Sequence, residues 1–97
     1  MLEHVLNARS VAIIGASRNK TKRGYQAIKT LLADGFEGEI YPVNPKEDFI
    51  LGLKCFKDIT DIPDKVDLAL ITTPARTIPK ILDSCGAKGV AGAVIIA

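Results

Sequence analysis

Short apolar runs alternate along the chain with segments of helical spacing. Three segments are largely apolar: residues 10–14, 67–72 and 91–97. They lack the alternation of apolar and polar residues that marks a strand with one solvent-exposed face, so each predicts a buried parallel strand. Residues 39–43 form a further strand candidate, in which Pro42 lacks a backbone donor and therefore suits a strand end.

Two helices are expected between these strands. In the first, apolar side chains recur at helical spacing, at Tyr25, Ile28, Leu31 and Leu32. Gly35 follows where a left-handed C-terminal cap belongs. The second shows the same spacing, at Ile78, Ile81, Leu82 and Cys85. We expect it to begin at Thr77 as N-cap, with Pro79 in the first turn, where a missing donor costs little. Gly86 or Gly89 is expected to end it.

This succession of strands and helices predicts an α/β fold, a doubly wound parallel sheet with helices on both faces. Residues 42–52 read as a turn and surface connection, residues 53–56 as a short extra strand, and residues 58–65 as a polar link with one helical turn.

Composition limits the class of protein. A chain of 97 residues, 47% of them hydrophobic, can bury one modest core, which predicts a single domain over residues 1–97. No apolar stretch approaches the ~20 residues of a membrane helix, and no secretory signal precedes the first strand, so we expect a cytoplasmic protein without a membrane partner. Cys55 and Cys85 lack metal-ligand spacing and are expected to be reduced, structural thiols. An apolar strand at the end suggests an N-terminal fragment of a larger protein, although a natural terminus can also be a strand.

Charge is distributed unevenly. Residues 1–33 hold six of the 13 Lys and Arg and one acid, whereas residues 34–97 hold seven cations and ten acids. This asymmetry indicates an anionic partner for one face. It does not indicate nucleic acid, because no basic helix stripe or aromatic platform accompanies the cations.

The first strand leads into a basic loop over residues 15–23. In a doubly wound sheet, ligands bind outside the carboxyl ends of the strands, and the turn after the first strand meets phosphate. The next glycine after Gly15 is Gly24, so the dinucleotide fingerprint G-x-G-x-x-G and the P-loop motif are both absent. After the second strand, dinucleotide-binding domains carry an acidic residue that hydrogen-bonds the adenosine ribose. This chain has Lys46 in that region instead. A long loop can instead bring hydroxyls, backbone donors and mobile cations to several phosphates.

Two further stretches are expected at the same edge of the sheet. The strand over residues 39–43 ends in Asn44 and Pro45, and the strand over residues 67–72 ends in a turn with Thr73, Pro74 and Ala75. This small-residue turn offers a flat wall for a base or an extended chain. Alternatively, Pro74 merely separates strand from helix.

At these places the chain resembles the coenzyme A-binding domain that opens the NDP-forming acyl-CoA synthetases, relatives of the α subunit of succinyl-CoA synthetase. The matching stretches are "SVAIIGAS", "GEIYPVNPK", "VDLALITTPA" and "KGVAGAVIIA", in family order and roughly family spacing. The resemblance implies a Rossmann-like fold that binds the nucleotide of coenzyme A (CoA) or acyl-CoA. It places CoA contacts at Gly15, Ala16, Ser17, Arg18, Lys46, Thr73, Pro74 and Ala75. From the basic loop and the shared sheet edge, we expect Lys20, Arg23, Asn44 and Pro45 to belong to the same CoA site.

The resemblance also implies a larger enzyme. Its reaction converts acyl-CoA, NDP and phosphate into acid, CoA and NTP through an acyl phosphate and a phosphohistidine. The phosphorylated histidine belongs to a later domain, and His4 matches nothing catalytic. This chain would contribute CoA binding and no catalytic residue or metal site, beside ligase and ATP-grasp domains or a second subunit. A homo-oligomer is compatible with this.

Two other functions share the pattern. A stand-alone CoA-sensing or regulatory domain would have the same fold without catalytic partners. An NAD(P)-binding domain of an oxidoreductase would show the same order of strands and helices, because fold alone does not fix function.

Overall fold

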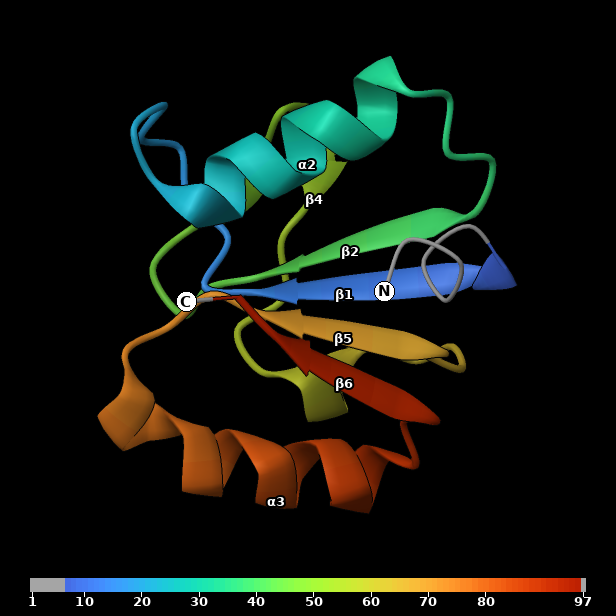
Figure 1. Ribbon diagram of the computed structural model, residues 1–97, viewed down its shortest axis with the longest axis vertical. Coiled ribbons are helices and arrows are strands. Elements are labelled where there is room, and N and C mark those ends of the chain that lie inside the picture. Colours follow the sequence, from blue (N-terminus) through green and yellow to red (C-terminus); the bar gives the residue numbers. More distant parts are fainter. Residues whose placement is uncertain (1–6, 97) are drawn as a thin grey trace.

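A four-stranded parallel sheet forms the centre of the molecule. The computed structural model describes residues 7–96. The strands are β1 (Ser10–Ile14), β2 (Glu39–Val43), β5 (Leu68–Ile71) and β6 (Gly92–Ile95), in the order β2-β1-β5-β6 (Figure 1). All three neighbouring pairs are parallel, which confirms the predicted doubly wound sheet.

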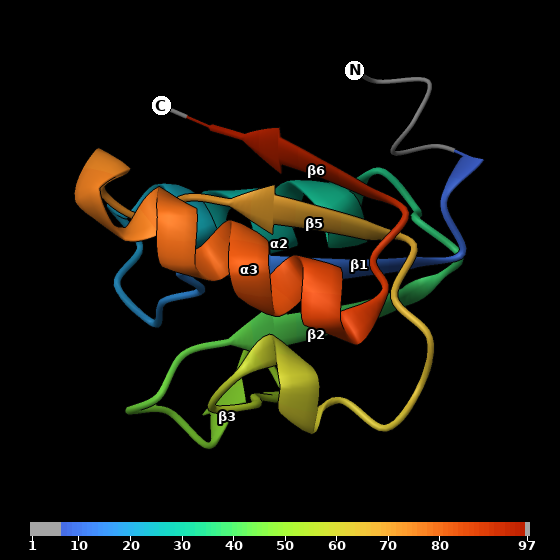
Figure 2. The ribbon, with the colours of Figure 1, turned by 90° about the horizontal axis from the view of Figure 1, so that it is seen from below.

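One helix covers each face of this sheet. Helix α2 (Arg23–Ala33) lies on one face and helix α3 (Ile78–Lys88) on the other, as the two views show (Figures 1 and 2). Successive side chains of β1 enter opposite cores: Val11 and Ile13 pack on the α2 side, Ala12 and Ile14 on the α3 side. Because both faces of the strand are buried, its sequence is apolar without alternation.

The helix ends largely agree with expectation. Gly35 and Gly89 adopt the left-handed conformation after α2 and α3, with φ of 76° and 82°. Thr77 is the N-cap of α3 and Pro79 lies in its first turn, as predicted, but the Thr77 side chain makes no capping hydrogen bond. The 3₁₀ turn η2 (Ala75–Thr77) precedes α3, and the Thr77 hydroxyl instead donates to the Pro74 carbonyl.

The segment after β2 contains a hairpin that the sequence did not reveal. Strands β3 (Phe49–Ile50) and β4 (Leu53–Lys54) pair antiparallel, although we predicted a surface connection before residue 53 and a strand that continued to Phe56. Phe56 instead forms an isolated bridge with Val43 at the end of β2. The 3₁₀ turn η1 (Ile59–Asp61) then confirms the predicted helical turn in the polar link.

The two cysteines are buried free thiols, as predicted. Burial raises the pKa of both Cys55 and Cys85 above the ordinary value of 9.0. A raised folded-state pKa means that their contribution to stability is complete below about pH 9 and is lost as the pH rises through the folded-state value.

We therefore expect the free energy of unfolding in urea to fall as the pH rises above about 9. The decline should be smaller in a variant with Cys55→Ala and Cys85→Ala, which controls for the other groups that titrate in this range. Equal slopes for the two proteins would contradict the prediction.

Candidate functional site

The carboxyl ends of all four strands point to one edge of the sheet (Figure 2). From β1 the chain passes through α2 to β2, and from β5 it passes through α3 on the opposite face to β6. The winding therefore reverses between the neighbours β1 and β5. Crevices at such a switch point are the usual ligand sites of doubly wound sheets.

Strand register brings the three predicted loops together at this edge. Ile14 pairs with both Val43 and Ile71, so the residues that follow these three strand ends are neighbours. The Gly15 amide donates to the Val43 carbonyl at 3.1 Å, and the Thr72 amide donates to the Ile14 carbonyl at 2.9 Å. The loops after β1, β2 and β5 thus form one continuous surface.

Gly15 and Gly24 have separate structural tasks in the basic loop. Gly15 has a φ of 91°, which other residues rarely adopt, and a Cβ there would lie 2.5 Å from the Thr72 hydroxyl. Gly24 lies in the first turn of α2, where a Cβ would lie 2.8 Å from the Gly15 carbonyl carbon and 2.9 Å from the Ala16 Cα. These are the turn and helix-packing tasks that glycines perform in the dinucleotide fingerprint. The loop is therefore a lengthened version of that turn.

The first backbone donors of the loop are already used. The amides of Gly15 and Ala16 both donate to the Val43 carbonyl, at 3.1 and 3.3 Å. The Ala16 side chain is fully buried. Donors for a ligand at this loop must therefore come from Ser17 onward.

Asn44 joins the loop after β1 to the loop after β2. Its Nδ2 donates to the Ala16 carbonyl at 2.7 Å, and its Oδ1 accepts from the Lys46 amide at 2.8 Å. The Asn44 backbone amide also donates to the Phe56 carbonyl at 2.9 Å. With both ends of its side chain engaged, Asn44 acts here as a positioning residue for the two loops.

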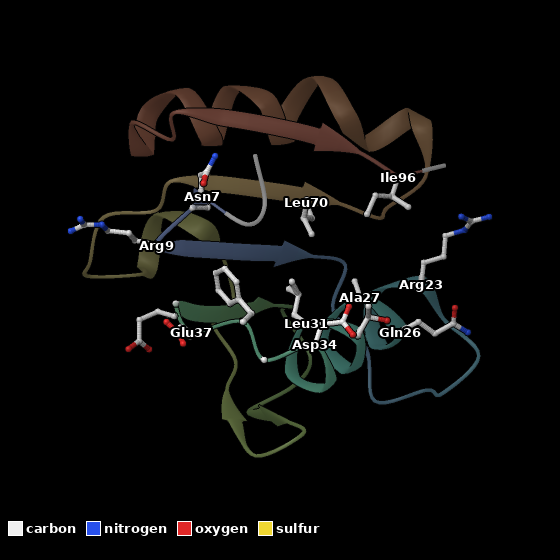
Figure 3. Close-up of a pocket in the computed structure, with 16 residues that line it drawn as sticks. Asn7, Arg9, Arg23, Gln26, Ala27, Leu31, Asp34, Glu37, Leu70 and Ile96 are labelled. Carbon is white, nitrogen blue, oxygen red and sulfur yellow. The ribbon is translucent and has the colours of Figure 1, made fainter. Parts of the chain in front are cut away.

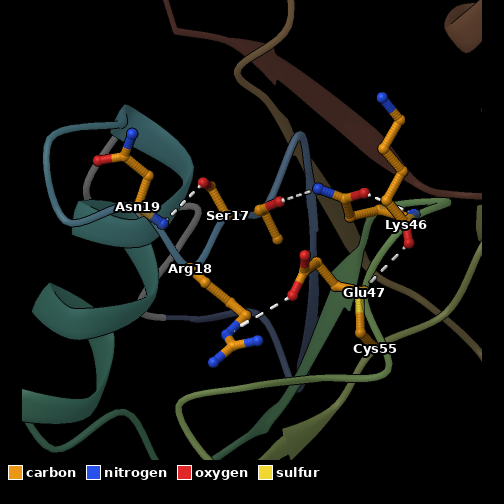
Figure 4. A network of polar contacts seen from close by, with 8 residues as sticks. Ser17, Arg18, Asn19, Lys46, Glu47 and Cys55 are labelled. Atoms are coloured by element: carbon orange, nitrogen blue, oxygen red, sulfur yellow. Dashed lines mark hydrogen bonds and ion pairs between the residues drawn. The ribbon is translucent and has the colours of Figure 1, made fainter.

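An ion pair joins the same two loops. Arg18 Nε lies 3.6 Å from Glu47 Oε2, and the Arg18 side chain is 74% exposed (Figure 4). Ser17 Oγ and Asn19 Oδ1 accept amide hydrogen bonds within the loop, from Asn19 and Thr21 respectively. The loop is thus ordered by its own polar groups, while an exposed ion pair of this length holds Arg18 only weakly.

A cleft of about 300 Å³ opens at this edge on the α3 side of the sheet. Four of the predicted site residues line it, namely Gly15, Asn44, Pro45 and Thr73. Ser17, Arg18 and Lys46 lie in the adjoining network (Figure 4), and Lys20 is exposed in the same loop. Pro74 and Ala75 are exposed where β5 leads into α3. The structure therefore places four of the twelve predicted residues on the cleft and three more in the adjoining polar network.

The cleft also contains residues that sequence reasoning missed. Lys57 and Asp58 line it from the loop after β4, and Thr77 and Ser84 line it from the α3 side. The polar link over residues 58–65 looked like a solvated connector, and its sequence carries no signal of this position.

A larger hollow of about 890 Å³ lies elsewhere, on the α2 face of the sheet (Figure 3). Its walls include Arg9 and Glu37, near the amino ends of β1 and β2, and Leu70 and Ile96 form part of its apolar lining. Arg23, a predicted site residue, lines this hollow and not the cleft. Only the smaller cleft lies where the three loops meet.

Neither a candidate metal cluster nor a candidate membrane-spanning helix occurs within residues 7–96. No group of three His, Cys, Asp or Glu side chains there could hold a metal ion. No helix in this part of the chain is long and apolar enough to cross a membrane. His4 lies outside the described residues.

The family that this chain matches and two related ligases all carry CoA in their names. Residues 9–97 match the family described as CoA binding domain. The chain is 50% identical over 95 residues to an ADP-forming acetate–CoA ligase of Methanocaldococcus jannaschii, covering 98% of this chain and 13% of the ligase. It is 48% identical to the α subunit of ADP-forming acetate–CoA ligase I of Pyrococcus furiosus, covering 92% of this chain and 20% of the subunit.

A solved structure agrees with these relatives. The dinucleotide forming acetyl-coenzyme A synthetase 1 of Ca. Korarchaeum cryptofilum, in complex with phosphate and ADP, superposes with a TM-score of 0.93 at 42% identity. The match covers all of this chain and 21% of that one. The chain therefore spans only about a fifth or less of the length of these relatives.

Proposed function

The chain belongs to the CoA-binding domain family, and from this premise we propose that the cleft and basic loop at the carboxyl edge of the sheet bind the nucleotide of CoA. The observation that carries the proposal is the convergence of three loops at the switch point, around a cleft with an apolar floor. The predicted contact residues in these loops remain part of the proposal.

Charge at the loop supports a ligand with several phosphates. Helix α2 has no side-chain cap and no acid in its first turn, so the positive end of its dipole is left without a local negative charge. Lys22 occupies its N-cap position, and Arg18, Lys20 and Arg23 lie nearby in sequence. An anion at this edge would gain from both the helix terminus and the cations.

We further propose that the domain serves an NDP-forming acyl-CoA synthetase. The names of the relatives support this, and the chain covers 13% and 20% of the lengths of the two ligases. CoA binding and thiol placement would be the task of this chain, while the phosphohistidine, the ligase and ATP-grasp parts and the acyl site would lie elsewhere in the enzyme. A homo-oligomer and a cytoplasmic location stay predictions.

Calorimetric titration of the full-length protein with CoA tests the proposal. We expect saturable binding of CoA and no displacement of a fluorescent CoA analogue by NADH. NADH binding in preference to CoA would identify a nicotinamide-binding domain and overturn the proposal. The absence of any heat with CoA would also overturn it.

A further inference from the structure

The cleft at the switch point contains a single Lys or Arg among the residues that line it, and it comes from outside the basic loop. This residue is Lys57, which follows the bridge between Val43 and Phe56. That bridge fixes its backbone beside the end of β2. On the basis of the proposed function, we propose that Lys57 binds a phosphate of CoA and helps the cleft to select the phosphorylated ligand.

The ammonium group is already held at the cleft. Lys57 Nζ donates to the Pro45 carbonyl at 3.2 Å, which places the charge next to the loop that carries Lys46. A lysine ammonium has three donors, so two remain for phosphate oxygens. The Lys57 side chain is also exposed, which leaves those donors accessible. A tethered cation loses less side-chain entropy on binding than a free one.

The charge of Asp58 gives Lys57 a second task. Asp58 also lines the cleft, and its Oδ1 accepts hydrogen bonds from the amide and hydroxyl of Thr60, at 2.9 and 2.8 Å. These bonds lower the pKa of Asp58 and keep its carboxylate ionised. Without Lys57, the only charge among the lining residues would be this carboxylate, which repels phosphate. Lys57 therefore offsets the negative charge of Asp58 as well as donating hydrogen bonds.

Three variants of the full-length protein separate the effect of the Lys57 charge from that of its hydrogen bond to the Pro45 carbonyl. Lys57→Gln keeps an N–H donor for the Pro45 carbonyl but removes the charge, whereas Lys57→Arg keeps the charge. Lys29→Gln removes one charge from an exposed position on α2 and serves as the matched control. Each protein is titrated with CoA, dephospho-CoA and pantetheine, and its thermal unfolding is recorded.

We expect Lys57→Gln to weaken CoA binding about tenfold, the loss of one charge-assisted hydrogen bond. Lys57→Arg and Lys29→Gln should bind as the wild type does, and pantetheine, which has no phosphate, should be unaffected throughout. An equal loss for dephospho-CoA assigns Lys57 to the pyrophosphate, and a smaller loss assigns it to the 3′-phosphate.

Two results would overturn the inference while leaving the proposed function intact. One is wild-type affinity for CoA in Lys57→Gln. The other is a parallel loss of pantetheine binding and thermal stability, which would make Lys57 a purely structural tether. Failure of the wild-type protein to bind CoA would instead refute the proposed function itself.

Discussion

Gly24→Ala is expected to destabilise the protein by about 3 kcal/mol, near the upper end of the usual cost of overpacking. The added methyl group would overlap the Gly15 carbonyl and lie 2.9 Å from the Ala16 Cα, and both neighbours are backbone that cannot rotate away. Relief requires α2 to move off β1, which would also move the basic loop. Urea unfolding measures the loss of stability, and titration with CoA measures the accompanying loss of affinity.

Gly86→Ala provides a matched control. Gly86 lies in α3 and is exposed, and apart from its chain neighbours and the local helix backbone no atom lies within 4 Å of the position its Cβ would take. The same substitution should therefore stabilise the protein by about 0.5–1 kcal/mol through helix propensity. If Gly24→Ala proved as stable as the wild type, the close packing of α2 on Gly15 would be wrong.

Asn44→Asp is expected to cost about 2 kcal/mol of stability although it changes no heavy-atom positions. The substitution replaces the amide donor that faces the Ala16 carbonyl at 2.7 Å with a second acceptor, while the bond from the Lys46 amide can persist. The loop after β1 then loses its attachment to the loop after β2. We expect CoA affinity to fall about tenfold, since the ligand must order the loop on binding.

Asn19→Asp tests whether this loss reflects geometry or merely an added charge. The Asn19 Oδ1 accepts from the amide and hydroxyl of Thr21, at 3.0 and 2.8 Å, and a carboxylate can accept both bonds. Thermal unfolding should therefore be little changed by Asn19→Asp and clearly lowered by Asn44→Asp. Equal effects of the two substitutions would argue against a positioning role for Asn44.

The strands and helices could be predicted because their signals are local. A strand buried on both faces, such as β1, must be continuously apolar, and one glycine after each helix supplies the left-handed turn at Gly35 and Gly89. The β3–β4 hairpin could not be predicted, because two-residue strands have no periodicity. Its turn also places Leu51 at a φ of 50°, which is unusual for a bulky residue.

The sequence by itself determined the doubly wound order, the three loops at one sheet edge and the basic character of the first loop. The tertiary structure alone decided how those loops are built. The amides of Gly15 and Ala16 donate to the Val43 carbonyl. Gly24 packs on Gly15, and Lys57 lines the cleft. Helical and strand periodicity follow from neighbours along the chain. Contacts between residues far apart in sequence depend on how whole elements pack, and no local pattern records them.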